Sequence, residues 1–187
     1  METPLYRLLE RKTGSPEGAE DAISQIAGRL GLPSDSAGEL PAGLALCARG
    51  ERPETVAKYL GWKDFEGFSS AILRAKGYMV REDIHLRRPR AQIDVLGISD
   101  RISLAVDCKH WARSPGRGAL SALVSTQKER ARRLHDSLDQ LGGIAAVILV
   151  MVDGGERFVD GGAVVPIFAF GDFLDNVEAC RSSLDLV

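Results

Sequence analysis

The feature that most constrains the fold is an unbroken apolar run from residue 144 to residue 152, Ile-Ala-Ala-Val-Ile-Leu-Val-Met-Val. It is too short to cross a bilayer, which takes about 20 apolar residues, and it has the length of a strand buried on both faces. Before it, apolar residues from Leu120 to Leu141 recur at helical spacing, and Gly142-Gly143 ends the pattern. A long helix leading into a buried strand is typical of a crossover between parallel strands. The sequence therefore predicts an α/β fold.

The remaining elements follow from periodicity and from turn residues. We expect a helix from Asp64 to Gly77, strands that begin at Tyr78 and occupy residues 91–98, 102–110 and 164–170, and a closing helix at residues 173–183. Pro166 predicts a sheet edge or a bulge for the strand at 164–170. Residues 33–43 have a loop-like composition and are expected to link two pieces. The predicted organisation is a helical N-terminal extension at residues 1–52 and a domain at residues 53–187 with a mixed sheet flanked by helices.

Several classes of protein are disfavoured. No apolar run reaches the length of a membrane span, and the first residues do not resemble a secretory signal. The three cysteines, Cys47, Cys108 and Cys180, are widely scattered and lack the spacing of a disulfide framework or a zinc site. We therefore expect reduced thiols, a cytoplasmic location and no association with membranes.

The formal net charge of −2 argues against binding to nucleic acid by bulk attraction alone. Basic residues are nevertheless dense between Arg74 and Arg133, whereas acids dominate the last third of the chain. A basic middle segment fits a protein with one phosphate-facing side. For the cluster from Arg130 to Arg133 alone, a solvated helix face is an equally good interpretation.

The residues that carry chemistry lie on two neighbouring predicted strands. On the strand at 102–110, alternation places Asp107 and Lys109 on one face, about 7 Å apart along the strand, and Leu104, Val106 and Cys108 on the other. On the strand at 91–98, Asp94 stands between apolar neighbours. If the two strands pair as a hairpin, Asp94 can approach Asp107. Two carboxylates so close repel each other unless a cation lies between them, and Mg²⁺ prefers such oxygen ligands.

Asp94, twelve intervening residues and then Asp107-Cys108-Lys109 resemble the D-(x)n-(D/E)-x-K signature of the PD-(D/E)xK nucleases. These include restriction endonucleases and Holliday-junction resolvases. The phrases at residues 62–66, 92–95 and 106–111 are especially similar to archaeal restriction-endonuclease-like proteins, and the resemblance covers roughly residues 54–175. Gln92 departs from the Glu of many relatives, and Asp107 is shorter than the commoner Glu. The resemblance implies a restriction-endonuclease-like fold and a Mg²⁺-dependent deoxyribonuclease in which Mn²⁺ can substitute.

The resemblance also implies roles for residues. Asp94 and Asp107 would bind the metal together with the backbone carbonyl of Cys108, and Lys109 would orient or deprotonate the attacking water. Glu66 matches a glutamate that the superfamily often supplies from the helix before the first strand, as a catalytic residue or second metal ligand. The alternative for Glu66 is an acid favoured by the dipole at the start of its helix.

We expect DNA as the substrate, recognised by its backbone or shape more than by its sequence, with a homodimer as one way to present two active sites. The candidate nucleic-acid contacts are Arg81, Arg87, Arg88, Arg90, Arg113, Arg117, Gln127, Lys128 and Arg130. A hydrogen-bonded helix residue is the simpler interpretation of Gln127. Trp111 is expected to cover the end of the sheet, with stacking on a base as the alternative. The rival functions are an inactive nucleic-acid-binding module of the same fold, an exonuclease and an RNA-directed nuclease.

Overall fold

The computed structural model describes residues 3–30, 39–87, 89–111, 113, 115–137 and 142–187. The helices are α1 (Pro4–Thr13), α2 (Pro16–Leu30), α3 (Glu39–Ala48), α4 (Pro53–Ala57), α5 (Trp62–Ala75), α6 (Arg117–His135) and α7 (Phe170–Asn176), with short 3-10 turns η1 (Ile167–Ala169) and η2 (Arg181–Ser183). The strands are β1 (Met79–Leu86), β2 (Ala91–Ile98), β3 (Ser103–Lys109), β4 (Ile144–Val150), β5 (Phe158–Val159) and β6 (Gly162–Pro166).

Over the described part of the chain, the strands form one mixed sheet in the order β1-β2-β3-β4-β6-β5. β1, β2 and β3 pair antiparallel, and β4 then joins β3 in parallel after the chain has crossed through α6. β6 lies parallel to β4, and β5 closes the far edge antiparallel to β6. All of β4 is buried. The predicted α/β class, the parallel crossover and the central buried strand are therefore confirmed.

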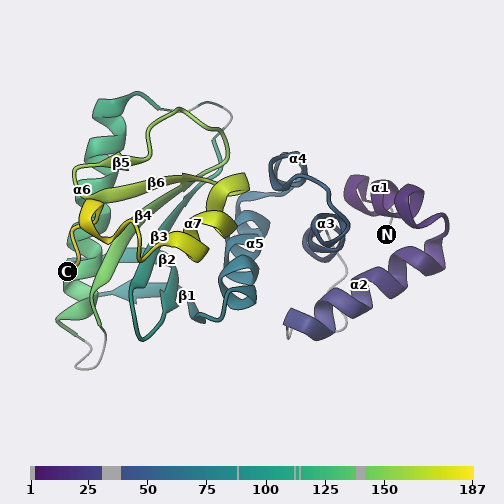
Figure 1. The fold of residues 1–187 in the computed structure, drawn as a ribbon, viewed down its shortest axis with the longest axis horizontal. Helices are drawn as coiled ribbons and strands as arrows, with labels where there is room; N and C mark the ends of the chain where they lie inside the picture. The colour runs from purple at the N-terminus through teal and green to yellow at the C-terminus, as the bar shows by residue number, and fades with distance from the viewer. Residues whose placement is uncertain (1–2, 31–38, 88, 112, 114, 138–141) are drawn as a thin grey trace.

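Helices cover both faces of this sheet (Figure 1). On one face of the sheet, Phe65, Phe68 and Leu73 of α5 are buried in an apolar cluster. Phe170 of α7 belongs to the same cluster. These α5 positions follow the 3–4 residue spacing that gives a helix one apolar side. Leu134 of α6 packs against the opposite face. The result is a sheet flanked by helices, which is the arrangement of the restriction-endonuclease-like fold.

The N-terminal helices α1, α2 and α3 lie beyond α5 and α4, away from the sheet (Figure 1). Their apolar side chains nevertheless belong to the same core as α5: Leu9 of α1 and Leu46 of α3 are buried in the same cluster as Phe65. α3 approaches α5 closely at Gly67, where an added Cβ would come within 2.9 Å of Leu40 Cδ2. None of the described helices is both long and apolar enough to span a membrane.

Two expectations about local structure were wrong. Residues 39–43, expected within a loop, begin helix α3, and residues 31–38 lie outside the described chain. The strand expected at 164–170 is β6, which ends at Pro166 before η1 and α7. Pro166 is the last residue of β6 and lies opposite Val150 of β4. The short β5 pairs only with Gly162 and Ala163, so β6 has a strand on one side alone at Pro166, in agreement with the expected edge position. A proline tolerates that position because the ladder ends there.

Candidate active site

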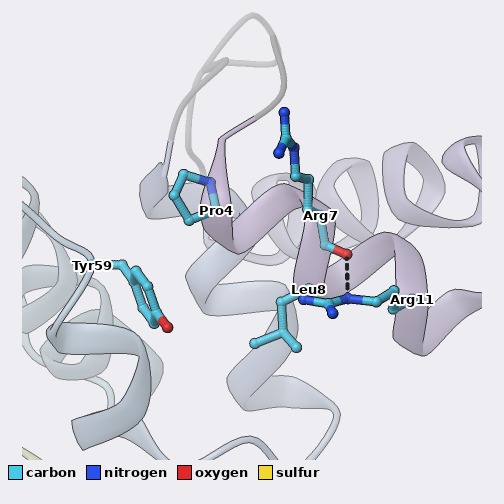
Figure 2. Close-up of a pocket in the computed structure, with 5 residues that line it drawn as sticks. All are labelled: Pro4, Arg7, Leu8, Arg11 and Tyr59. Atoms are coloured by element: carbon cyan, nitrogen blue, oxygen red, sulfur yellow. Dashed lines mark hydrogen bonds between the residues drawn. The ribbon is translucent and has the colours of Figure 1, made fainter.

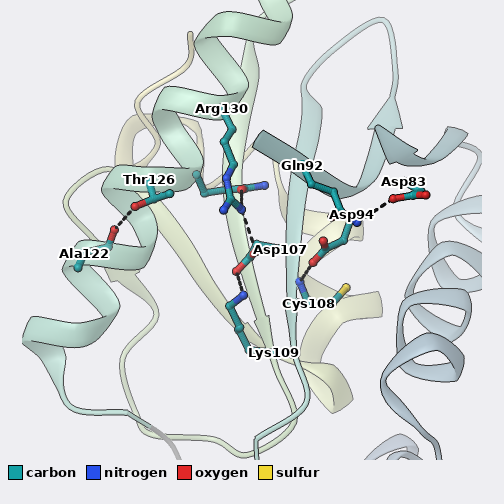
Figure 3. A network of polar contacts seen from close by, with 10 residues as sticks. Asp83, Gln92, Asp94, Asp107, Cys108, Lys109, Ala122, Thr126 and Arg130 are labelled. Atoms are coloured by element: carbon teal, nitrogen blue, oxygen red, sulfur yellow. Dashed lines mark hydrogen bonds and ion pairs between the residues drawn. The ribbon is translucent and has the colours of Figure 1, made fainter. Parts of the chain in front are cut away.

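Asp94 and Asp107 meet at the end of the ladder between β2 and β3. The pairs Val95–Val106, Leu96–Ala105 and Gly97–Leu104 set the register, and one further step in it sets Asp94 opposite Asp107. The Asp94 carboxylate accepts a hydrogen bond of 2.8 Å from the backbone N–H of Cys108 (Figure 3). The predicted approach of the two acids is therefore present in the structure.

Asp107 is buried, with 3% of its surface exposed, and two cations compensate its charge. Lys109 Nζ lies 2.8 Å from Oδ2, and Arg130 Nη1 lies 3.2 Å from Oδ1. Figure 3 shows the carboxylate between the lysine of its own strand and the arginine that descends from α6. A buried carboxylate without such partners would be costly. The sequence analysis proposed Arg130 as a contact to nucleic acid, and it did not predict the ion pair of Arg130 with Asp107.

Gln127 lies one turn before Arg130 on α6 and is completely buried. Its Oε1 accepts a hydrogen bond of 3.3 Å from Arg130 Nη1, so it points toward the sheet as expected. Its Nε2 has no hydrogen-bond partner among the residues that the structure describes. A buried amide donor without a partner carries a free-energy cost, which a bound water or a ligand oxygen would remove.

Glu66, on α5, is electrostatically coupled to the same acids. Burial, followed by the charges of Asp94 and Asp83, raises the pKa of Glu66 from 4.5 to about 7. The pKa of Asp94 is also raised, first by burial, and the Cys108 N–H opposes that shift. Like charges near one another disfavour the ionised forms. The acids of α5 and β2 thus form one electrostatic unit, although Glu66 makes no direct ligand-like contact that would fix its role.

Asp83, on β1, is an acid of this region that the sequence analysis missed. The β1–β2 pairs Glu82–Val95 and Ile84–Ile93 leave Asp83 across from Asp94. Its φ of 52° is unusual for a residue other than glycine, and it accepts a hydrogen bond of 2.7 Å from Gln92 Nε2. Gln92 of β2 thus donates a hydrogen bond to an acid of the neighbouring strand. The pairing register between β1 and β2 would have identified Asp83 as a neighbour of Asp94, but the sequence alone does not give that register.

The opposite face of β3 is structural, as the alternation predicted. The Cys108 thiol lies 3.6 Å from Ser69 Oγ of α5, and burial raises its pKa. His110 Nε2 lies 2.8 Å from the carbonyl oxygen of Ala57, and its ring packs edge-on against Phe65 with centroids 5.3 Å apart. These contacts fix the end of β3 against α4 and α5.

The predicted nucleic-acid contacts differ in exposure and in pairing. Arg81, Arg87, Arg90 and Arg113 are exposed, and Arg88 lies outside the described residues. Arg117 pairs with Glu156 at 2.7 Å, and Lys128 pairs with Asp185 at 2.5 Å. A separate groove of about 360 Å³ lies between α1 and the segment after α4 (Figure 2). Its lining consists of Pro4, Arg7, Leu8, Arg11 and Tyr59.

The chemistry available at the β2–β3 end is oxygen ligation of a hard cation. Over the described residues, no group of three or more His, Cys, Asp or Glu side chains is arranged to hold a metal. The Asp94 and Asp107 pair would therefore need help from a backbone carbonyl, water or substrate oxygens, which is how Mg²⁺ is commonly bound. Two acids and a lysine at one strand end are the arrangement that the sequence led us to expect for a nuclease that cleaves phosphodiester bonds.

Residues 57–135 match the family model Mrr_cat, described as a restriction endonuclease. This segment belongs to the PD-(D/E)xK superfamily, and it contains Glu66, Asp94, Asp107 and Lys109. No curated protein matches the chain. The superfamily and fold class predicted from the sequence are thus confirmed, and the protein carries a nuclease domain of restriction-endonuclease type.

Proposed function

We propose that the protein is a divalent-metal-dependent DNA endonuclease that hydrolyses phosphodiester bonds at the end of β3. The observation that carries this proposal is the convergence of Asp94 and Asp107, with Lys109 Nζ 2.8 Å from the Asp107 carboxylate. This convergence falls inside the segment that matches the restriction endonuclease family model.

The donor set fits Mg²⁺ or Mn²⁺. Asp94, Asp107 and the carbonyl of Cys108 offer oxygen atoms, the ligands that hard cations prefer. Such an ion, when bound, lowers the pKa of a coordinated water and offsets charge on the phosphate. The buried Nε2 of Gln127, unpartnered in the described chain, would gain an acceptor from a water or phosphate held at the same place.

The remaining roles belong to the side chains around the acids. Lys109 orients the attacking water, and its charge offsets the negative charge that develops on the phosphate oxygens. Glu66, with its pKa near 7, positions a water or accepts a proton close to neutral pH. Arg130 holds Asp107 in the metal-free protein.

The proposal extends to the substrate and to the organisation of the chain. The exposed Arg81, Arg87, Arg90 and Arg113 contact phosphates, which position DNA without reading its sequence. Recognition then rests on backbone and shape, with two active sites presented by a homodimer. Residues 1–52 form a helical extension that packs against α5, and residues 53–187 form the nuclease domain.

One observation favours a second candidate, an inactive nucleic-acid-binding module. Both oxygens of Asp107 are already paired within the protein, by Lys109 and by Arg130. A site that had lost its metal would be stable in this arrangement. The alternative predicts DNA binding that divalent ions do not convert into cleavage.

Cleavage assays separate these candidates. The protein is incubated with plain, flapped and branched DNA and with RNA, in Mg²⁺, Mn²⁺, Ca²⁺ or excess chelator. We expect cleavage of DNA in Mg²⁺ or Mn²⁺, binding without efficient turnover in Ca²⁺, and no cleavage in chelator. Circular single-stranded and duplex substrates distinguish an endonuclease from an exonuclease. Cleavage that persists in chelator, or no cleavage with any metal, would contradict the proposal.

A further inference from the structure

The two tryptophans of the chain are both exposed. Trp62 has 60% and Trp111 has 41% of its surface exposed. Trp111, which the sequence led us to expect over the end of the sheet, thus keeps a large part of its surface exposed. Large aromatic side chains are usually buried, and exposed ones gathered near a site commonly mark a binding surface.

Both indoles lie close in the chain to residues of the candidate active site. Trp62 lies one helical turn before Glu66 on α5, so the two side chains share a helix face. Trp111 follows Lys109 by two residues at the end of β3. His110, next to Trp111, packs on Phe65, which is three residues from Trp62. One tryptophan thus belongs to the helix that carries Glu66, and the other directly follows the strand that carries Asp107 and Lys109.

Each indole has a lysine beside it. Lys63 Nζ lies 5.4 Å from the ring of Trp62, and Lys109 Nζ lies 5.9 Å from the ring of Trp111. Lys109 is also the residue that pairs with Asp107. An aromatic plane next to a cation is complementary to a nucleotide, which offers a base face next to a phosphate.

We propose that Trp62 and Trp111 stack on unpaired bases on the two sides of the phosphodiester bond that is cleaved. In a duplex the base faces are covered by their neighbours, so stacking on a side chain requires single-stranded, frayed or flapped nucleic acid. The proposal rests on the proposed function and narrows its substrate to sites where bases have left the helix. Tyr59, three residues before Trp62 in the chain, is itself 51% exposed and lines a groove together with Arg11 of α1 (Figure 2).

Intrinsic fluorescence tests this directly, because every tryptophan of the chain takes part. The full-length protein is titrated in Ca²⁺ with a single-stranded oligonucleotide, with the blunt duplex of the same sequence and with a flapped duplex. We expect the single strand and the flap to quench the emission strongly and the blunt duplex to leave it nearly unchanged. Trp62→Phe and Trp111→Phe should each retain part of the quenching.

Alanine variants measure the contribution of each ring. Trp62→Ala and Trp111→Ala should each weaken single-strand binding roughly 5- to 150-fold, the loss expected for one base–aromatic stack. Met79→Ala is the matched control, because Met79 is a large apolar side chain that is 64% exposed. Met79 pairs with Ile98, the last residue of β2, and not with the part of β2 that carries Asp94, so binding should not change. Melting temperatures verify that all variants fold.

The outcomes separate the two proposals. A protein that cleaves blunt duplex with metal, yet shows no quenching by single strands, overturns the stacking and leaves the nuclease function intact. A protein whose emission is quenched by single strands, but which cleaves nothing with any metal, overturns the nuclease function and retains the stacking surface. Equal loss of affinity in Met79→Ala and Trp111→Ala would also refute the stacking.

Discussion

Arg130 on α6 and Asp107 on β3 form a largely buried ion pair across the sheet–helix interface, with 3.2 Å between Nη1 and Oδ1. Only 5% of the Asp107 side chain and 27% of the Arg130 side chain are exposed. Together with Lys109, Arg130 supplies the positive charge that a metal would supply at the same carboxylate. The protein's own cations thus hold the Asp107 carboxylate in place.

The first prediction concerns Arg130→Met. Removing the guanidinium leaves Asp107 less well compensated, so the metal-free protein should lose about 1–3 kcal/mol of stability. Mn²⁺ no longer competes with Arg130, and it should therefore raise the melting temperature of the variant by more than that of the wild type. Thermal melts with and without Mn²⁺ measure both effects. Arg132→Met is the control, because Arg132 pairs with the exposed Glu129 and should respond as the wild type does.

The second prediction separates the roles of the acids and the lysine. Asp94→Asn and Asp107→Asn should abolish Mn²⁺ binding and cleavage, since each removes a charged oxygen ligand. Lys109→Ala should abolish cleavage while leaving the fold and much of the metal binding. Calorimetric Mn²⁺ titration of the three variants is the measurement. If Lys109→Ala loses metal affinity as completely as Asp107→Asn, the assignment of roles is wrong.

A third prediction tests the packing of α6 on the sheet. At Gly162 an added Cβ would come within 2.5 Å of Val124 Cγ1, a buried side chain of α6 that cannot easily move. Gly162→Ala should therefore lower the free energy of unfolding by about 1–3 kcal/mol in chemical denaturation. Gly28→Ala, inside α2 and with no atom of the described residues within 4 Å of the added Cβ, should instead stabilise the protein by about 0.5–1 kcal/mol.

Much of the site was predictable because short-range rules control it. The apolar residues around Asp94 and the tight turn before Ile102 fixed β2 at residues 91–98 and its antiparallel pairing with β3. Once that register holds, Asp94 must approach Asp107. The buried run that forms β4 similarly implied the crossover through α6.

What escaped prediction depends on long-range packing. Pro41 and Gly43 suggested a loop, yet Pro41 lies in the first turn of α3, where its missing N–H costs nothing. Gly43 lets Val56 of α4 approach, since a Cβ there would meet Val56 Cγ1 at 2.6 Å. Arg130 reaches Asp107 because α6 packs on this face of the sheet, and its helical spacing does not tell which of its side chains comes to lie beside Asp107.

The last prediction is a pH dependence of stability centred on Glu66. Burial and the charges of Asp94 and Asp83 raise the pKa of Glu66 from 4.5 to about 7 in the folded protein. The folded state therefore holds a proton that the unfolded chain releases above about pH 4.5, and stability falls as the pH rises toward 7. Glu66→Gln removes this penalty. In excess chelator the variant and the wild type should melt alike near pH 5, and the variant should melt at the higher temperature near pH 8. Glu129→Gln, on the exposed side of α6, should show no such gain. A wild-type protein that stays as stable as Glu66→Gln at pH 8 would show that Glu66 is not held among the acids of the site.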